Sequence, residues 1–231
     1  EKILTNLGKE HGYEIVCSKD GRLFDPDRIG EWDAFAFYTT GDLTNGSGGD
    51  KQPPMSKEGK QALLDAIAAG KGFIGFHSAT DTFHSRGNEV DPYIKMIGGE
   101  FIIHGAQQKA KCVVSDPKFP GVQAFGPRYE LLDEWYTQKH LASDLHVIIY
   151  HDTEGMQGPM YQRPNFPETW ARMHGKGRVM YTSMGHREDV WENSKFQALC
   201  VGGLEWITGA VDASVTPNFD EVTPKGNQFP S

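Results

Sequence analysis

A short apolar run that ends in polar residues is the first place in the sequence where chemistry could be performed. The run covers residues 73–76, and His77, Ser78 and Asp81 follow it. It comes after a helix-like segment ending in Ala-Ala-Gly, which is typical of a buried parallel strand after a crossover helix. Ligands of open α/β sheets bind beyond the carboxyl ends of the strands. We therefore expect these three residues at a functional rim, with His77 as a mere strand cap as the alternative.

Three more candidate residues follow predicted strands or turns, namely His104, Glu134 and His186. Neutral imidazoles beside a carboxylate suit general acid–base catalysis, because the ordinary pKa of histidine is about 6.5. The catalytic set that we predict is His77, His104, Glu134 and His186. The same set could instead bind Zn²⁺ or Mn²⁺, which take imidazole nitrogen and carboxylate oxygen, although no H-E-x-x-H spacing is present. Both interpretations stay open, and the cofactor is therefore undetermined.

Each of these candidates also has a purely structural interpretation. His104 could anchor a loop, and His186 could hydrogen-bond near Asp189 at the start of a helix. Asp133 could cap or pair with an arginine, so we favour its neighbour Glu134 as the reacting carboxylate. Five further histidines lie in polar or turn contexts, and we expect them at the surface: His84, His140, His146, His151 and His174.

Aromatic side chains near the candidates could shape a carbohydrate pocket. Tyr136 follows Glu134, and Trp170 lies in a later predicted strand. Sugars present apolar faces that stack on aromatic rings. Arg172 shares a face with Trp170 and could hold a carboxylate or sugar hydroxyls, or pair with Glu134. With Ser78 and Asp81, these residues form the predicted substrate-binding set; core packing is the alternative for Trp170.

Composition restricts the class of protein. The chain has 231 residues and a formal net charge of −8, with no visible basic stripe. These features disfavour binding to nucleic acid or to an anionic membrane, and no apolar run is long enough to span a bilayer. The chain has three cysteines, at positions 17, 112 and 200, which lie far apart in the sequence. This spacing disfavours a disulfide framework or a cysteine zinc site.

The pattern of apolar residues and breakers predicts alternating strands and helices. We expect helices over residues 3–12, 25–30, 56–70, 91–98 and 194–208, and a long loop over 39–54. Strands are expected over 13–17, 34–38, 73–76, 101–103, 109–114, 129–132 and 145–150. A hairpin should pair residues 169–173 with 179–182 across the turn at 174–177. The residues after 210 have no apolar period, and we expect an extended C-terminal tail over 210–231.

Seven short segments together resemble one protein family. They are Thr39-Thr40-Gly41-Asp42, Gly72-Phe73-Ile74-Gly75-Phe76-His77-Ser78-Ala79-Thr80-Asp81, Gly98-Gly99-Glu100-Phe101 with His104, Asp133-Glu134-Trp135-Tyr136, Trp170-Ala171-Arg172, Gly175-Lys176-Gly177-Arg178-Val179, and Thr182-Ser183-Met184-Gly185-His186. The chain resembles the trehalose-utilisation (ThuA-like) family over residues 1–209. The family's opening strand, and the following loop with a Phe-Arg-His-like motif, are absent, so we expect that strand to lie upstream.

The resemblance implies a class I glutamine amidotransferase-like fold. This means one α/β domain over 1–209 with a flavodoxin-like, open and mostly parallel sheet, helices on both faces, and extra β-hairpin elements in the second half. The amidotransferase relatives place a cysteine after the central strand, but that turn here holds His77 and Ser78. Cysteine-based glutamine hydrolysis is therefore disfavoured, and the G-x-S-x-G pattern of a serine nucleophile is missing.

The resemblance also implies a role in carbohydrate metabolism, because family members are associated with sugar dehydrogenases that make 3-keto sugars. The leading hypothesis is an enzyme, a hydrolase or lyase, acting on a sugar or keto-sugar derivative; a non-catalytic sugar- or partner-binding module is the alternative. The expected partner is a small-molecule sugar, with a homo-oligomer also allowed. Because the family includes many exported proteins, a periplasmic or secreted location is favoured over the cytoplasm.

Overall fold

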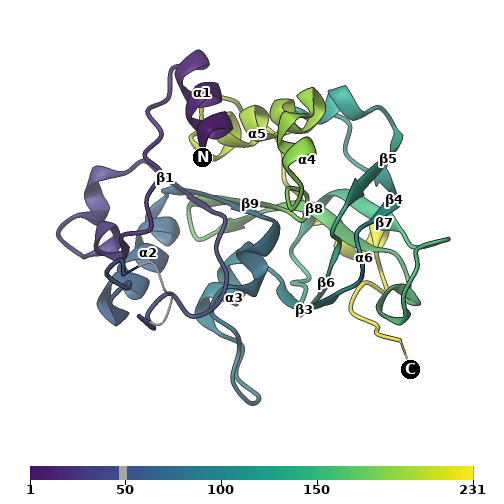
Figure 1. The fold of residues 1–231 in the computed structure, drawn as a ribbon, viewed down its shortest axis with the longest axis horizontal. Helices are drawn as coiled ribbons and strands as arrows, with labels where there is room; N and C mark the ends of the chain where they lie inside the picture. Colours follow the sequence, from purple (N-terminus) through teal and green to yellow (C-terminus); the bar gives the residue numbers. More distant parts are fainter. Residues whose placement is uncertain (47–50, 231) are drawn as a thin grey trace.

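A computed structural model describes residues 1–46 and 51–230, so part of the expected loop, residues 47–50, lies outside the described residues. Seven of the described strands form one sheet, in the order β1-β2-β9-β8-β7-β4-β5 (Figure 1). Two more strands, β3 and β6, form a separate antiparallel pair. The strands are β1 (Ala34–Phe37), β2 (Gly72–Phe76), β3 (Glu100–His104), β4 (Gln108–Val114), β5 (Arg128–Asp133), β6 (Tyr136–Lys139), β7 (His146–Asp152), β8 (Phe166–His174) and β9 (Gly177–Thr182).

The direction of the strands corrects one expectation. Only β1, β2 and β9 run parallel, whereas β9, β8, β7, β4 and β5 alternate in antiparallel fashion. The sheet is therefore mixed, and the expected mostly parallel sheet is wrong. The reason is that the second half of the chain connects several strands without crossover helices, and a short turn can join only antiparallel neighbours. The β8–β9 hairpin itself is confirmed, with Thr169 paired to Thr182 and His174 to Gly177.

Helices cover both faces of the sheet, as expected. The α helices are α1 (Lys2–Glu10), α2 (Lys57–Ala69), α3 (Pro92–Ile97), α4 (Glu188–Glu192), α5 (Ser194–Ile207) and α6 (Phe219–Val222). Helices α1 and α5 lie on one side of the parallel strands, and α2 and α3 lie on the other (Figure 1). The predicted starts are confirmed for α2 and α3, where the side chains of Ser56 and Asp91 accept backbone N–H bonds.

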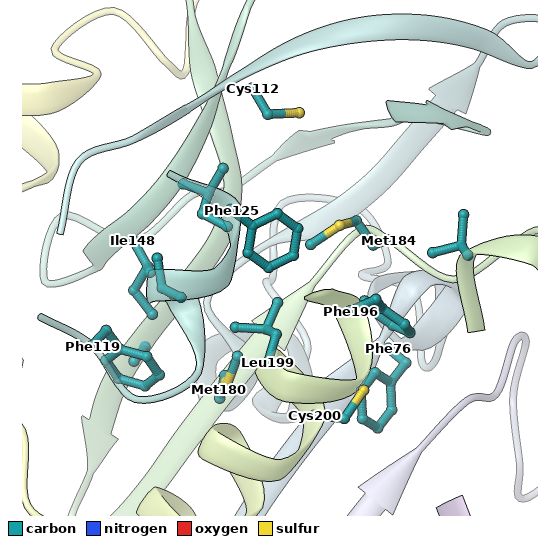
Figure 2. Close-up of a cluster of buried hydrophobic side chains, with 14 of the residues drawn as sticks. Phe76, Cys112, Phe119, Phe125, Ile148, Met180, Met184, Phe196, Leu199 and Cys200 are labelled. Atoms are coloured by element: carbon teal, nitrogen blue, oxygen red, sulfur yellow. The ribbon is translucent and has the colours of Figure 1, made fainter. Parts of the chain in front are cut away.

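Strand β2 lies between the two halves of the core. All five of its residues are buried, which explains the uninterrupted apolar run. Phe73 packs with α2 and α3, and Ile74 and Phe76 pack on the opposite face with α5. Figure 2 shows this second cluster, in which Phe76 and Met180 lie among side chains of α5 such as Leu199. Burial on both faces makes the end of β2 a rigid position for whatever follows it.

Two expectations for the first thirty residues are wrong. Residues 13–17 pair with no strand among the described residues, because Tyr13 bonds Thr208 at the end of α5 and Ile15 lies against Gly8 of α1. Their alternating pattern therefore reflects packing on helices rather than on a sheet. The expected helix at Asp25-Pro26 is a turn between two 3-10 helices, Gly21–Phe24 and Ile29–Glu31.

The C-terminal tail is tied to the sheet. It has no regular secondary structure over residues 212–218, and the Asn218 side chain bonds both the N–H and the carbonyl of Val147 in β7. Phe219, in α6, is buried against the core. Across the described part of the chain, no helix has the length and apolar character needed to cross a membrane.

Candidate functional site

His77 stands where three parallel strands end. The chain leaves β2 at Phe76 and enters a 3-10 helix, His77–Asp81, with the backbone φ of His77 at +41°. This left-handed conformation is uncommon for a residue with a side chain and costs on the order of 1–3 kcal/mol, so packing must hold it. Since β1 and β9 are parallel to β2, Tyr38 and the segment that carries His186 follow strand ends at the same edge.

The structure brings the four predicted catalytic residues together around the Glu134 carboxylate. Glu134 Oε2 lies 3.4 Å from His77 Nε2 and 3.3 Å from His186 Nδ1, and Oε1 lies 3.3 Å from His104 Nδ1. The side chains of His77 and Glu134 are 2% and 12% exposed, whereas those of His104 and His186 are 40% and 38% exposed. One carboxylate thus joins a buried imidazole to two accessible ones.

Asp133 holds this arrangement rather than taking part in it. Its fully buried carboxylate accepts the backbone N–H groups of Glu134, Gly185 and Arg187, at 2.9, 2.7 and 3.1 Å. Burial raises the pKa of Asp133, while the three N–H bonds and His186 oppose that rise. The Asp133 carboxylate therefore positions both Glu134 and the loop of His186, which agrees with the preference for Glu134 as the reacting group.

The protonation of the His77 ring follows from its contacts. Nδ1 lies 2.9 Å from the carbonyl oxygen of Ser183, so Nδ1 carries the proton and donates. Burial lowers the pKa of His77 to about 4. The hydrogen bond to Ser183 opposes this shift, and the nearby His186 adds to it. Nε2 is buried and has no hydrogen-bond partner among the described residues, although Glu134 lies close. A neutral His77 thus aims a free lone pair at the carboxylate.

Aromatic rings line the site. Tyr136 is buried, with its ring centre 4.2 Å from that of His77, and it stacks on His104 at 5.6 Å. The exposed Tyr38 lies 6.3 Å from His77 and edge-on to Trp191 at 5.9 Å. Tyr136 therefore fulfils its predicted position next to the histidines, and Tyr38 adds an accessible ring that the sequence analysis missed.

The remaining predicted binding residues divide into two groups. Ser78 is half-buried on the 3-10 helix after β2, and Asp81, on the same helix, bonds Thr40 and His84. These two residues lie on the element that carries His77. Trp170 and Arg172 instead lie in the core on β8, away from the four catalytic candidates.

Trp170 and Arg172 serve the packing of α3. The Trp170 indole donates to the carbonyl of Ile97, and its ring packs on Tyr181. Arg172 bonds the carbonyl of Met96 and pairs with Asp144, not with Glu134. The structural alternative for Trp170 is what the geometry supports, because strand alternation places a residue on a face without telling which end of the strand borders the site.

We expect the substitution Trp170→Phe to lower the free energy of unfolding by about 2–3 kcal/mol, because it removes one buried hydrogen bond and leaves a cavity. Urea denaturation measures this loss. The matched exposed variant Tyr38→Phe should leave stability within about 0.5 kcal/mol of the wild type. A Trp170→Phe protein of unchanged stability and altered sugar affinity would instead assign Trp170 to the pocket.

Sequence reasoning also missed Glu168, a fully buried carboxylate behind the His77 contact. Its Oε1 accepts from the hydroxyls of Thr182 and Ser183 and from the N–H of Met184, and its Oε2 accepts from Thr169. Burial raises the pKa of Glu168 to about 7, although these bonds favour the charged form. The available signal in the sequence was a lone carboxylate inside an apolar strand.

Two of the five histidines that we expected at the surface are buried. His146 bonds the Asp116 carboxylate at 2.9 Å and the Thr216 carbonyl at 2.7 Å. His151 lies between Trp135 and Phe166, where burial lowers its pKa to about 3. Both residues lie on strand β7, which neighbouring strands and the C-terminal tail cover. The polar residues around them in the sequence do not reveal this long-range burial.

An open cavity of about 420 Å³ borders the site at His186. Its lining is polar and consists of Gln107, His186, Arg187, Glu188, Asp189 and Glu192. Arg187 crosses it, bonding Gln107 at 2.7 Å and Asp189 at 2.8 Å. The cavity is large enough for a small polar molecule, and His186 is the catalytic candidate that it reaches.

Comparisons with known proteins agree with the family resemblance. The sequence model of the ThuA family, described as trehalose utilisation, matches residues 1–207. A ThuA-like protein from Bacteroides uniformis is 18% identical, with a TM-score of 0.69 over 94% of this chain and 85% of that one. A second, from Parabacteroides merdae, is 14% identical, with a TM-score of 0.67 over 99% and 90%.

A cytoplasmic protein from Salmonella typhimurium has the same kind of fold, at 13% identity and a TM-score of 0.58 over 92% of this chain and 87% of that one. The search of curated proteins found no match. At these identities the solved structures establish a shared fold.

Proposed function

The chain belongs to the ThuA family of trehalose utilisation, and from this premise we propose that it is an enzyme acting on a sugar or keto-sugar derivative. The observation that carries the proposal is the Glu134 carboxylate, which lies within 3.4 Å of three imidazoles at the edge where the parallel strands end. Imidazoles beside a carboxylate are the groups that general acid–base catalysis uses. Such a set can also bind a metal ion that polarises a carbonyl.

The two kinds of histidine suit different tasks in this chemistry. His104 and His186 are accessible to a substrate and can exchange protons with solvent. His77 is buried and fixed by Ser183, so its free Nε2 is held in one direction. Abstraction of a proton next to a keto group, or hydrolysis of a glycosidic bond, uses one group as the base and another as the acid.

The proposed ligand is a small-molecule sugar. The exposed Tyr38 offers a ring on which the apolar face of a sugar can stack, whereas the buried Tyr136 packs on His77 and His104 and supports them. Asp81 and Ser78 offer polar groups on the same 3-10 helix as His77. The reaction classes that fit this site are hydrolysis and elimination. Cysteine chemistry has no support at this site. Cys112 and Cys200 are buried in the core, where burial raises the pKa of both thiols, and the exposed Cys17 contacts Thr5 of α1.

The experiment that tests the proposal is a turnover assay with glycosides, free sugars and their 3-keto derivatives. We expect the wild type to convert at least one of them, and the substitution His77→Ala to lower kcat/KM by about 10²-fold or more, which is the usual loss when a general acid–base group is removed. The control is His11→Ala, an exposed histidine at the end of α1, which should retain full activity. Circular dichroism verifies that both variants are folded.

Two results would contradict the proposal. Full activity in a folded His77→Ala protein would remove this site from the reaction. Saturable sugar binding without turnover of any compound would make the protein a sugar-binding module.

A further inference from the structure

The acceptor atoms at the centre of the site face one another without a donor between them. We propose that His77, Glu134 and His186 form the binding site of one divalent transition-metal ion, for which zinc is the test ion. The proposal rests on the same residues as the proposed function and specifies the cofactor of that site. It can be tested without any substrate.

The contacts of His77 favour a cation beside its ring. A carbonyl oxygen only accepts, so the 2.9 Å contact with Ser183 requires the proton on Nδ1 and leaves Nε2 as a lone pair. That lone pair lies 3.4 Å from Glu134 Oε2, and an ionised carboxylate also only accepts. Nε2 is buried and bonds to nothing else in the described part of the chain. Two acceptors held face to face in a buried place repel each other unless a proton or a metal cation lies between them, and His77 Nε2 makes no hydrogen bond to this carboxylate that would indicate a shared proton.

The spacing of the ligand atoms also fits a metal ion. In a tetrahedral zinc site with bonds of about 2.0–2.1 Å, neighbouring ligand atoms are about 3.3–3.4 Å apart. Glu134 Oε2 lies 3.4 Å from His77 Nε2 and 3.3 Å from His186 Nδ1. The three ligand atoms all lie within 4.8 Å of one another. His186 is 38% exposed, so a small rotation of its side chain can bring its nitrogen closer to that of His77.

Further hydrogen bonds hold the candidate ligands in place. Metal-bound histidines usually donate their second N–H to a carbonyl or carboxylate, as His77 does to Ser183. The Asp133 carboxylate holds the N–H groups of Gly185 and Arg187, on both sides of His186. His104 Nδ1 lies 3.0 Å from the Gly105 carbonyl, so it carries a proton and donates to that oxygen. The same nitrogen lies 3.3 Å from Glu134 Oε1, while Oε2 faces His77 and His186.

The donor set selects the class of metal. Two imidazole nitrogens and one carboxylate suit zinc and similar transition metals, whereas Mg²⁺ and Ca²⁺ prefer an all-oxygen set. Three protein ligands are also the number found in catalytic zinc sites, in which the fourth position remains open. An open fourth position would accept a sugar oxygen, and the exposed imidazole of His104 lies 3.3 Å from Glu134 Oε1, beside the ligand set.

The test is metal binding to the full chain. Untagged protein purified without chelator is analysed for its elements, then stripped with chelator and titrated calorimetrically with zinc chloride. We expect about one zinc per chain and a rise in Tm on binding. Cobalt should give the intense visible absorption of a tetrahedral site.

Two variants connect binding to the residues. The substitution His186→Ala removes an accessible ligand with little risk to folding, and it should weaken zinc binding by at least about tenfold. His84→Ala is the matched control, because His84 is also an accessible imidazole beside carboxylates, those of Asp81 and Glu100, and it should bind zinc like the wild type.

The outcomes separate this inference from the proposed function. Absence of zinc binding at millimolar concentration, or equal binding by His186→Ala and the wild type, overturns the metal site even if sugars are converted. Zinc binding that depends on His186 supports the metal site even if no sugar in the panel is converted, in which case only the proposed function fails.

Discussion

Replacing Asp133 by alanine is expected to lower the free energy of unfolding by about 3–6 kcal/mol, the largest effect on stability that we predict. The substitution leaves the N–H groups of Glu134, Gly185 and Arg187 without their acceptor, and each unsatisfied buried group costs about 1–3 kcal/mol. Burying the Asp133 carboxylate is itself unfavourable, so we expect a loss in the lower part of what three unsatisfied groups would cost together. Urea denaturation at neutral pH measures the loss.

The same variant should also disturb the site, because the lost bonds hold both Glu134 and the loop of His186. The stability of Asp133→Asn is expected to lie between those of the wild type and Asp133→Ala. Its amide retains one acceptor oxygen but turns an NH₂ group toward one of the N–H donors. The matched control is Asp212→Ala, an exposed aspartate paired with Arg178, which should change stability by less than about 1 kcal/mol. A loss below about 1 kcal/mol in Asp133→Ala would show that this carboxylate does not hold the loop.

The substitution Glu168→Gln should change how stability depends on pH. The pKa of Glu168 is about 7 in the folded protein, against its usual 4.5, so between these pH values the folded chain binds a proton that the unfolded chain releases. The contribution of Glu168 is therefore fully present below about pH 4.5 and is lost as pH rises through 7. The loss amounts to roughly 3 kcal/mol, and the amide of the Glu168→Gln variant cannot titrate.

The measurement for this prediction is a comparison of two proteins across pH. Unfolding free energies at about pH 5 and about pH 8 should show the wild type losing roughly 3 kcal/mol relative to Glu168→Gln. Taking the difference removes the opposite contribution of buried His151, which is common to both proteins. Glu130→Gln, an exposed site on β5, serves as control and should follow the wild type. Parallel pH curves for the wild type and Glu168→Gln would mean that Glu168 is charged throughout this range.

The sequence by itself determined the local elements that carry the site. The buried apolar run before His77 predicted β2, and the capping residues Ser56 and Asp91 predicted the starts of α2 and α3. The turn at 174–177 predicted the β8–β9 hairpin. These features depend on neighbours in the chain, because strand burial, helix capping and turn geometry are decided over a few residues.

Only the tertiary structure decided which side chains meet. Polar residues after strands suggested His77, His104, Glu134 and His186, but their distances to one carboxylate depend on the order of the strands and on the pairing of β3 with β6. Trp170 and Arg172 had equally suitable types, yet their part of β8 packs on α3 instead.

Long-range packing also explains why the sequence did not reveal the buried ionisable groups. The burial of Glu168 and His151 depends on strands and helices far away in the chain, and only that burial shifts their pKa values. The mixed direction of the sheet likewise follows from how the hairpins of the second half associate. Local sequence therefore predicts elements and the side chains at their ends, whereas distance, burial and charge at the site arise from long-range packing.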